Sequence, residues 1–314
     1  MQEGTRDEAL EALHTPYCWG MNATDTRWGS GVNAEAIQAW DGPLFDRFVQ
    51  FRHILTTGLG VHGNEALRLT PPLEGQRVLD IGCGFGDTTQ QIAALVGPTG
   101  EAVGVDAAEN FIKASISEAE EAGVANARFF VADVQVDDLG GPYDAAFSRM
   151  GTMFFVSPVA ALRNVRKSLA PGGGLNMVVW RRREDNEWLY RAQQIVEGIV
   201  SRPDEYDEPT CGPGPFSMAN ADTVTDQLIA AGFEGISLRR CDLPILGGNS
   251  IDEAIEIVMS IGPAGEILRL LGDRAAPFMP KVDAALREAF SEFQREDGSV
   301  WGMASTWIVT ATAP

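Results

Sequence analysis

The sequence predicts an α/β protein with a doubly wound, Rossmann-like sheet and additional helices that the sheet does not require. From residue 76 onward, short runs rich in Val, Phe and Ala alternate with stretches of helical character. These runs lack strict polar alternation, which indicates parallel strands covered by helices on both faces. A glycine-rich turn follows the first run. A strand, a glycine turn and a helix in this order are typical of doubly wound nucleotide-binding folds.

The elements follow one another in a regular order along the chain. We expect strands at about 77–81, 102–106, 127–132, 143–148, 174–180, 235–243 and 303–312. We expect helices at about 88–96, 108–121, 158–169, 186–200 and 224–231, a short helix after the third strand, and a helical insertion over 251–294. Residues 1–75 are predicted to form a helical N-terminal cap and substrate region, and 76–182 the core. Residues 183–314 complete the sheet and carry an inserted helical cap at about 184–220 and 248–297.

Charge and cysteine usage limit the possible partners and the compartment. The 314 residues include 24 Lys and Arg against 44 Asp and Glu, a formal net charge of −20. Such a surface repels phosphate backbones, so we do not expect a nucleic-acid substrate. The four cysteines, Cys18, Cys83, Cys211 and Cys241, lack metal-site or disulfide spacing. With no signal peptide and no apolar run of membrane-spanning length, the sequence predicts a cytoplasmic protein without a metal or a membrane span.

The glycine-rich turn carries the main functional signal. It contains Gly82, Gly84 and Gly86, which let the backbone approach a ligand closely. On its own this spacing also fits a dinucleotide site. Asp80, two residues before the first glycine, separates the two interpretations: its carboxylate would repel a pyrophosphate but suits a cationic ligand such as the sulfonium and ammonium of S-adenosylmethionine (SAM).

Two further acids stand at the ends of the next two predicted strands. Asp106 ends the second strand, where a carboxylate can accept hydrogen bonds from both hydroxyls of a ribose. Asp133 ends the third, where it could accept a hydrogen bond from an adenine amino group, with Val134 beside the ring. Either acid alone is equally well explained as a helix N-cap. The three acids together with the glycines favour an adenosine-containing, cationic cofactor.

These motifs resemble those of the class I SAM-dependent methyltransferases. The resemblance rests on VLDIGCGFGDTT at 78–89, GVD at 104–106, ADV at 132–134, YDAAFSR at 143–149 and LAPGGGL at 169–175. The stretches 148–155 and 213–216 further resemble ubiquinone/menaquinone-type C-methyltransferases. The resemblance implies strand order 3-2-1-4-5-7-6 with an antiparallel last strand. It also implies SAM as cofactor, S-adenosylhomocysteine as product, and contacts from Asp80, Gly82, Gly84, Asp106, Ala107, Asp133, Val134 and Ser148. The sequence adds Cys83, Gly86, Thr88 and Arg149 to this expected cofactor site.

Candidate catalytic and substrate residues are fewer. His53 and His62 are the candidate general bases, and each could equally be a packing histidine. Arg149 could hold the cofactor carboxylate, an anionic group of the substrate, or a structural acid. Trp40, Met150, Met153 and Phe154 are expected to line an apolar site for a small hydrophobic or aromatic substrate.

Two other functions remain open on the sequence alone. The chain could bind SAM or S-adenosylhomocysteine without catalysis, or it could be a nicotinamide-dependent oxidoreductase, which Asp80 argues against. The extra helices could also form a homodimer.

Overall fold

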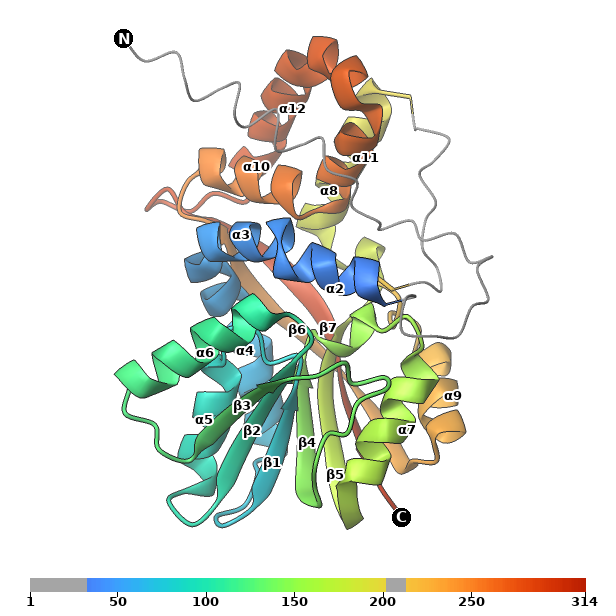
Figure 1. Ribbon diagram of the computed structural model, residues 1–314. Helices are drawn as coiled ribbons and strands as arrows, with labels where there is room; N and C mark the ends of the chain where they lie inside the picture. The colour runs from blue at the N-terminus through green and yellow to red at the C-terminus, as the bar shows by residue number, and fades with distance from the viewer. Residues whose placement is uncertain (1–32, 202–212) are drawn as a thin grey trace. The chain divides into compact units, whose positions relative to one another are not determined.

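A computed structural model of the protein describes residues 33–201 and 213–314. Its centre is a seven-stranded sheet of order β3-β2-β1-β4-β5-β7-β6 (Figure 1). The strands are β1 (Arg77–Ile81), β2 (Glu101–Asp106), β3 (Ala127–Val131), β4 (Tyr143–Arg149), β5 (Leu169–Trp180), β6 (Glu234–Gly248) and β7 (Val300–Thr312). The first five pair in parallel, and β7 runs antiparallel to β5. The predicted fold class and strand order are confirmed.

The helices around the sheet lie close to their predicted positions. They are α4 (Arg52–Leu69), α5 (Asp87–Val96), α6 (Glu109–Glu121), α7 (Pro158–Ser168) and α9 (Ala221–Ala231). Before α4 come two short helices, α2 (Ala34–Asp41) and α3 (Pro43–Gln50). Leu44 in α3 and Phe51 directly after it are buried. The core of the sheet is apolar. In its central strand β1, the side chains of Val78, Leu79 and Ile81 are almost completely buried.

Two predicted elements differ from the structure. The expected short helix after the third strand is absent, and Asp133–Asp137 form turns in which the carbonyl of Asp133 accepts hydrogen bonds from two backbone N–H groups. The fifth strand starts at Leu169, earlier than expected. The Pro-Gly-Gly sequence does not precede the strand but is part of it, and the register of the pairing between β4 and β5 shifts after Tyr143. Gly172 accommodates this with a φ of +81° and donates its N–H to the carbonyl of Ala313.

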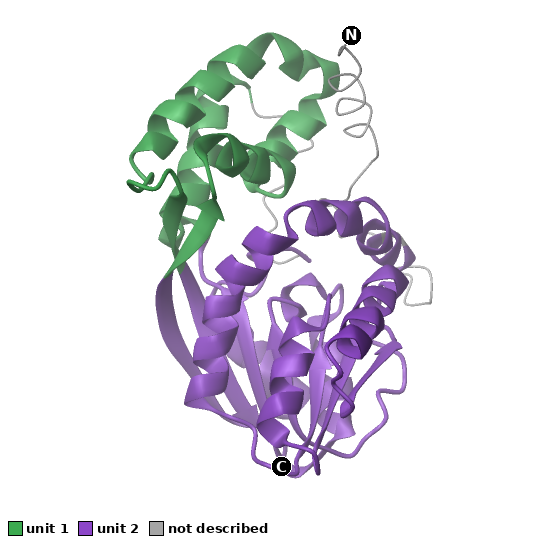
Figure 2. Cartoon of the chain, turned by 90° about the vertical axis from the view of Figure 1, so that its left-hand side faces the viewer, with its two compact units in different colours: residues 1–25, 183–209, 244–304 green, residues 26–182, 210–243, 305–314 purple. Residues whose placement is uncertain are grey.

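The chain divides into two compact units (Figure 2). One comprises 26–182, 210–243 and 305–314 and holds the parallel part of the sheet; the other comprises 1–25, 183–209 and 244–304. In the second unit α8 (Glu187–Ile199) packs with α11 (Pro263–Leu271) and α12 (Met279–Ser291), and α10 (Ile251–Ser260) contacts both of the latter. Trp188 lies directly over Gly302, where a Cβ atom would be only 2.4 Å from its Cγ. Cys18 and Cys211 lie outside the described residues, whereas Cys83 and Cys241 are free and buried.

Candidate cofactor site

The three predicted glycines form the turn between β1 and α5, called the glycine loop here (residues 82–86). Gly82, Gly84 and Gly86 have φ values of +67°, +55° and +78°, a region that side chains other than glycine rarely adopt. A Cβ on Gly86 would lie 2.8 Å from the rings and side chains of α6 and β3, and one on Gly82 would lie 3.0 Å from the backbone of Gly151. At Gly84 the nearest atom is 3.9 Å away. Packing therefore requires the outer two glycines, whereas a Cβ at Gly84 would make only an ordinary contact with the ring of Phe111.

Asp106 ties the glycine loop to the end of β2. One of its carboxylate oxygens accepts a hydrogen bond from the N–H of Gly84 at 3.0 Å, and the other accepts from the N–H of Ala108 at 3.0 Å. Burial raises the pKa of Asp106, and the hydrogen bonds from Ala108, Gly84 and Ala107 oppose that rise. Each oxygen keeps a lone pair for a further donor, so the oriented carboxylate fits a ribose diol.

Asp80 is buried at the end of β1 and does not stand alone. Its carboxylate accepts a hydrogen bond from the hydroxyl of Thr89 at 2.6 Å. Burial raises the pKa of Asp80 to about 7, against the effects of the Thr89 hydrogen bond and of the positive charge of Arg149. Arg149 forms an ion pair with Asp87 at 2.8 Å. The guanidinium at the end of β4 thus neutralises part of an acidic group of side chains beneath the glycine loop.

The side chain of Arg149 reaches this position across α4. At Gly63 a Cβ atom would lie 2.9 Å from the Cδ of Arg149, and at Gly60 it would lie 3.8 Å from its guanidinium. These glycines therefore make room for the arginine. Of the three roles that the sequence left open for Arg149, the structure displays the pairing with an acid.

Asp133 already holds several donors. One oxygen accepts from the backbone N–H of Gln135 at 3.0 Å and from its side-chain amide at 3.1 Å. The other accepts from the side-chain amide of Asn33 at 2.6 Å. Val134, the expected neighbour of an adenine ring, is buried. No sequence pattern indicated Asn33 or Gln135 as partners of this carboxylate.

The remaining expected cofactor residues surround the glycine loop. Ser148 is fully buried and donates its hydroxyl to the carbonyl of Ile81 at 2.8 Å. Thr88 is buried at the start of α5, and its hydroxyl has no hydrogen-bond partner in the described part of the chain. Burial raises the pKa of the Cys83 thiol well above its usual value, so it is a neutral part of the loop. Ala107 is half-buried beside Asp106.

An aromatic cluster covers the glycine loop. Its members are Trp40, Phe45, Phe48, Phe85, Phe111 and Phe154. The ring of Trp40 lies edge-on to Phe154 at a centroid distance of 4.9 Å, and Phe85 lies edge-on to Phe111 at 4.9 Å. Phe45 contacts both of the latter rings. The cluster thus joins α2 and α3 to the glycine loop, to α6 and to the segment after β4.

The other expected substrate residues lie in that segment after β4. Met150 is buried with a φ of +62°, and its N–H donates to the carbonyl of Val178 at 2.9 Å. Met153 is also buried, and its sulfur accepts from the N–H of Trp180 at 3.2 Å. The two methionines are therefore held against β5, and Phe154 is the member of this segment that joins the aromatic cluster.

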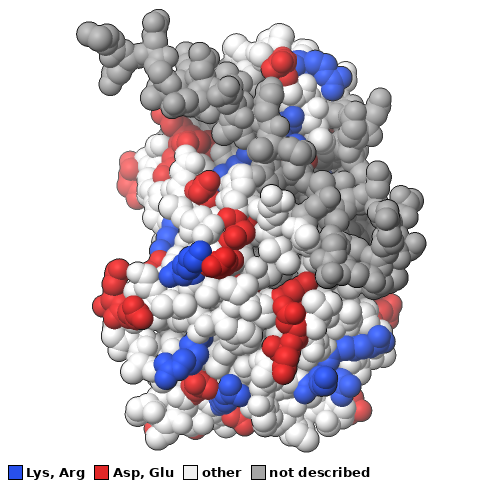
Figure 3. Space-filling model, in the orientation of Figure 1, with Lys and Arg blue, Asp and Glu red and all other residues white. Residues whose placement is uncertain are grey.

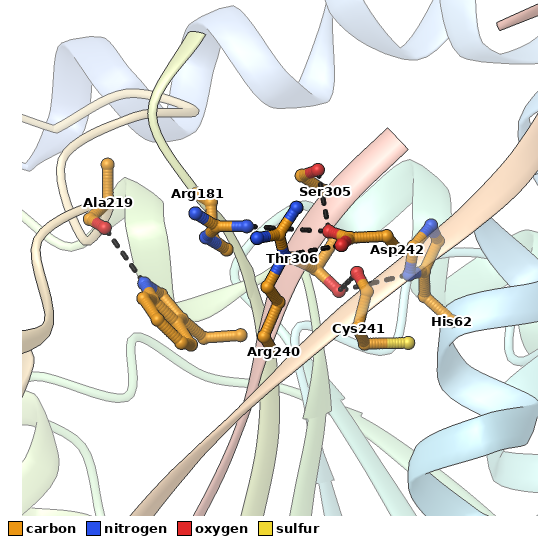
Figure 4. Close-up of polar contacts among 9 residues, drawn as sticks. His62, Arg181, Ala219, Arg240, Cys241, Asp242, Ser305 and Thr306 are labelled. Atoms are coloured by element: carbon orange, nitrogen blue, oxygen red, sulfur yellow. Dashed lines mark hydrogen bonds and ion pairs between the residues drawn. The ribbon is translucent and has the colours of Figure 1, made fainter. Parts of the chain in front are cut away.

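The two candidate bases have contrasting environments on α4. His53 is exposed, whereas His62 is completely buried. The Nδ1 of His62 lies 2.9 Å from the hydroxyl of Thr306, which also donates toward the carbonyl of Cys241 at 3.3 Å (Figure 4). The Nε2 of His62 has no hydrogen-bond partner among the described residues. Burial lowers the pKa of His62 to about 4, against the charge of Asp242.

A charged group that the sequence did not indicate lies next to this histidine (Figure 4). Asp242 on β6 accepts from the hydroxyl of Ser305 at 2.7 Å and pairs with Arg181 at 3.4 Å and with Arg240. Arg181 also lies over the ring of Trp307, 4.9 Å from its centroid. The network ties the end of β5 to β6 and β7. Sequence patterns reveal groups of residues that are close together in the chain. These residues come from three segments that are far apart in it, so no pattern indicated them.

Two searches of the described residues gave negative results. No group of three or more His, Cys, Asp or Glu side chains has the arrangement of a metal site. In the same ranges, no helix has both the length and the apolar character required to span a bilayer.

Comparisons with known proteins agree with the site. Residues 73–223 match the family model described as a methyltransferase domain. The chain is 29% identical to nocamycin O-methyltransferase of Saccharothrix syringae over 176 residues, which cover 53% of this chain and 62% of that enzyme. It is 36% identical to a ubiquinone/menaquinone biosynthesis C-methyltransferase of Ectopseudomonas mendocina over 103 residues, 32% of this chain and 40% of that enzyme. The matches therefore span less than two thirds of these relatives.

Solved structures show the same fold. A putative methyltransferase from Bacillus halodurans superposes with a TM-score of 0.52 at 14% identity, covering 81% of this chain and 100% of that one. Phosphoethanolamine N-methyltransferase 2 of Haemonchus contortus, solved with SAM, gives a TM-score of 0.52 at 16% identity over 90% of this chain and 59% of that one. The predicted family and the predicted cofactor are confirmed. Through its core, residues 73–223, the chain matches a methyltransferase domain and is similar to SAM-dependent methyltransferases.

Proposed function

We propose that the protein transfers the methyl group of SAM to oxygen or carbon of a small hydrophobic or aromatic molecule. The observation that carries this proposal is the aromatic cluster on the glycine loop, in which Trp40, Phe45 and Phe48 of α2 and α3 meet Phe85 of the loop itself. Apolar and aromatic walls with few polar groups are typical of small-molecule sites. The relatives named for nocamycin and aklanonic acid support a small-molecule methyl acceptor.

The residues at the strand ends are suited to hold the cofactor. Asp106 would accept the ribose hydroxyls, since both of its oxygens are already oriented by backbone N–H groups. The glycine backbone at Gly84 would face the methionine part, and the buried carboxylate of Asp80 would favour its cationic groups. When bound, SAM supplies an activated methyl group on a positive sulfur. The protein's own contribution is to align the two reactants in line.

Alignment and exclusion of water account for most of what such a site has to provide. Holding two reactants in a reactive geometry lowers a barrier by roughly 7–11 kcal/mol. The rings of Trp40, Phe111 and Phe154 would hold an apolar reactant and keep water away from the sulfonium. His62 and His53 remain candidate bases for a hydroxyl or an acidic carbon, and His62 is neutral near pH 7, as a base has to be.

The surface charge of the protein supports a small molecule, and not a nucleic acid, as the methyl acceptor. The face in Figure 3 carries acidic side chains interspersed with basic ones, and among the coloured residues the basic side chains form no continuous band. Together with the net charge of −20, this supports exclusion of a phosphate backbone.

The test begins with cofactor binding. SAM and S-adenosylhomocysteine are titrated into the protein by calorimetry, with NAD(H) as the ligand control and Asp106→Ala as the variant. We expect micromolar binding of both SAM compounds, its loss in the variant, and no heat with NAD(H). Absence of SAM binding would contradict the proposal, and binding of NAD(H) would favour an oxidoreductase.

Turnover is tested next with phenols, quinone precursors and fatty acids, using SAM with a labelled methyl group. Incorporation of label into one class identifies the methyl acceptor and its reacting atom. If SAM binds tightly and label enters none of a broad panel, a cofactor-binding protein without catalysis becomes the better explanation.

A further inference from the structure

Residues 213–219, called the 213–219 segment here, contact the residues that follow β4. The carbonyl of Met153 accepts two hydrogen bonds, one from the N–H of Gly214 at 3.0 Å and one from the hydroxyl of Ser217 at 2.6 Å. A carbonyl oxygen has two lone pairs, so both are used. The stretches 148–155 and 213–216, which carry the resemblance to one methyltransferase subgroup, are therefore in direct contact.

The residues after β4 are also held by β5. The sulfur of Met153 accepts a hydrogen bond from the N–H of Trp180 at 3.2 Å. Phe154 directly follows Met153 in the same short 3-10 turn, Thr152–Phe154. Its ring lies edge-on to that of Trp40 at a centroid distance of 4.9 Å. Because Met153 is fixed by its carbonyl and by its sulfur, the backbone that carries the Phe154 ring has little freedom to move.

The 213–219 segment is itself attached to β7. The carbonyl of Ala219 accepts a hydrogen bond from the indole N–H of Trp307 at 2.9 Å (Figure 4). Within the segment, the N–H of Ser217 donates to the carbonyl of Gly214 at 3.1 Å. Hydrogen bonds therefore connect β7, through the 213–219 segment, to the backbone next to Phe154.

We propose that Ser217 and Trp307 are positioning residues for the methyl acceptor, which act through Met153 to fix the ring of Phe154 against Trp40. The inference rests on the proposed function, because it takes the aromatic cluster as a wall of the acceptor site. The wall determines how an aromatic acceptor lies relative to the methyl group. A displacement of about 1 Å, caused far from the reacting atoms, can lower a rate by about a hundredfold.

The cofactor residues have a separate set of contacts. Asp106 is oriented by backbone N–H groups of its own strand end and of the glycine loop, and Asp80 accepts from the hydroxyl of Thr89. Ser217 and Trp307 take part in none of these hydrogen bonds. Loss of either contact to the 213–219 segment should therefore change the fit of the acceptor and leave the affinity for SAM near that of wild type.

Two aromatic probes of different size, phenol and 1-naphthol, measure that fit by calorimetry in protein saturated with S-adenosylhomocysteine. Ser217→Ala removes the hydroxyl from the carbonyl of Met153, which keeps the N–H of Gly214 as a donor. Ser217→Thr retains a hydroxyl. Ser291→Ala is the matched control, since it removes an equally short hydrogen bond, from a hydroxyl to the carbonyl of Glu288 at 2.6 Å, on α12.

The larger probe should be affected more, because it contacts more of the aromatic wall. We expect Ser217→Ala to raise the Kd of 1-naphthol about tenfold and that of phenol by no more than about threefold. Trp307→Phe removes the indole N–H but retains a ring beside Arg181, and it should shift the selectivity in the same direction. Ser217→Thr and Ser291→Ala should keep both constants within about twofold of wild type, and all variants should keep the Kd of S-adenosylhomocysteine within that range.

Hydrogen exchange tests the positioning step without any acceptor. Peptides that cover residues 150–157 should exchange faster in Ser217→Ala than in wild type, whereas peptides that cover the glycine loop should be unchanged. Faster exchange throughout the sheet would show general destabilisation in place of a local role, and it would overturn the inference.

Failure of this inference differs from failure of the proposed function. If wild type binds neither SAM nor S-adenosylhomocysteine, the proposed function is wrong and the inference falls with it. If wild type binds S-adenosylhomocysteine but neither probe, the aromatic acceptor class is wrong, and so is the role given to Phe154. If both probes bind wild type and Ser217→Ala weakens them equally or leaves both unchanged, Ser217 does not set the fit of the acceptor. In that case the inference is wrong and the proposed function stands.

Discussion

His62 makes a sharp prediction about stability and pH, because a histidine without exposed surface has to be neutral to stay buried. Its Nδ1 has Thr306 as a partner, whereas Nε2 has none among the described residues. Protonation would place a positive charge at that unpartnered nitrogen. Burial accordingly lowers the pKa of His62 to about 4, from 6.5 in an unfolded chain.

The size of the effect follows from these two values. A group whose pKa is lower in the folded state contributes stability that is complete above its unfolded pKa and is lost as the pH falls through the interval between the two. For His62 that interval is pH 6.5 to 4. At about 1.4 kcal/mol per pK unit, the free energy of unfolding drops by about 2 kcal/mol between pH 7 and 5, and by about 3 kcal/mol in total.

The assay is urea denaturation of wild type and His62→Leu at pH 7, 6 and 5. Leucine has a similar volume and no titrating group, and Thr306 can still donate to the carbonyl of Cys241. At pH 7 the two proteins should differ by no more than about 1 kcal/mol, because the variant loses one hydrogen bond and one unsatisfied nitrogen. At pH 5 the variant should have gained about 2 kcal/mol relative to wild type.

Other titrating groups do not disturb this comparison. Asp80 has a raised pKa, so the stability it contributes is present at low pH and is lost as the pH rises toward about 7, which is the opposite trend. That trend belongs to both proteins and cancels in their difference. His53→Gln, on the exposed face of the same helix, is the control, because it removes an imidazole and leaves the buried His62 in place. A wild-type minus His62→Leu difference that is equal at pH 7 and 5 would refute the reasoning.

Three further predictions concern the glycine loop and its surroundings. Because protonation of Asp80 removes the charge that attracts a cation, SAM affinity measured by calorimetry should fall from pH 8 to 6, by at most about tenfold per unit, and Asp80→Asn should abolish this dependence. Gly84→Ala should lower the free energy of unfolding in urea by only about 1–2 kcal/mol and weaken SAM binding at least tenfold. Gly86→Ala should unfold the loop, because its Cβ would lie 2.8 Å from a Phe129 ring atom. Equal stabilities of the two variants would contradict this. Met150→Gly should be more stable to heat than Met150→Ala by about 1 kcal/mol, the reverse of the usual order in strands and helices, because only glycine relieves the positive φ.

The sheet could be predicted in detail because its signals are local. A short run such as Val78–Ile81, apolar except for Asp80, indicates a strand when glycines follow it, and the observed strand ends where expected. The fifth strand shows the limit of this reasoning. Pro171-Gly172-Gly173 has the composition of a turn, but pairing with the last strand overrides that preference. Only the distant C-terminal segment, whose Ala313 exchanges hydrogen bonds with Gly172 and Gly173, carries this information.

The site could be predicted as a set of positions but not as a set of contacts. Asp106 and Gly84 were expected as neighbours of one ligand, and their mutual hydrogen bond follows from the same strand-end geometry. Asn33 was not foreseen, because an asparagine before a helix is ordinarily its cap. Its role depends on where α2 lies against β3, which no local pattern specifies. The same holds for His62, whose exposed and buried alternatives differ only in the face of α4 on which it lies.

Asp80 shows how a correct residue can act through a different mechanism from the one first considered. The sequence favours a direct or water-mediated contact between its carboxylate and a cationic ligand. In the structure the carboxylate is buried and bonded to Thr89, and an arginine lies near enough to lower its pKa against the effect of burial. A buried carboxyl group with a pKa near 7 is partly protonated at neutral pH, and a positive ligand nearby favours the ionised form.

Binding of SAM would therefore shift Asp80 to its ionised form, so binding near neutral pH should release a proton. Calorimetry in buffers of different ionisation enthalpy measures that proton directly, and binding without proton release would mean that Asp80 is already ionised in the free protein.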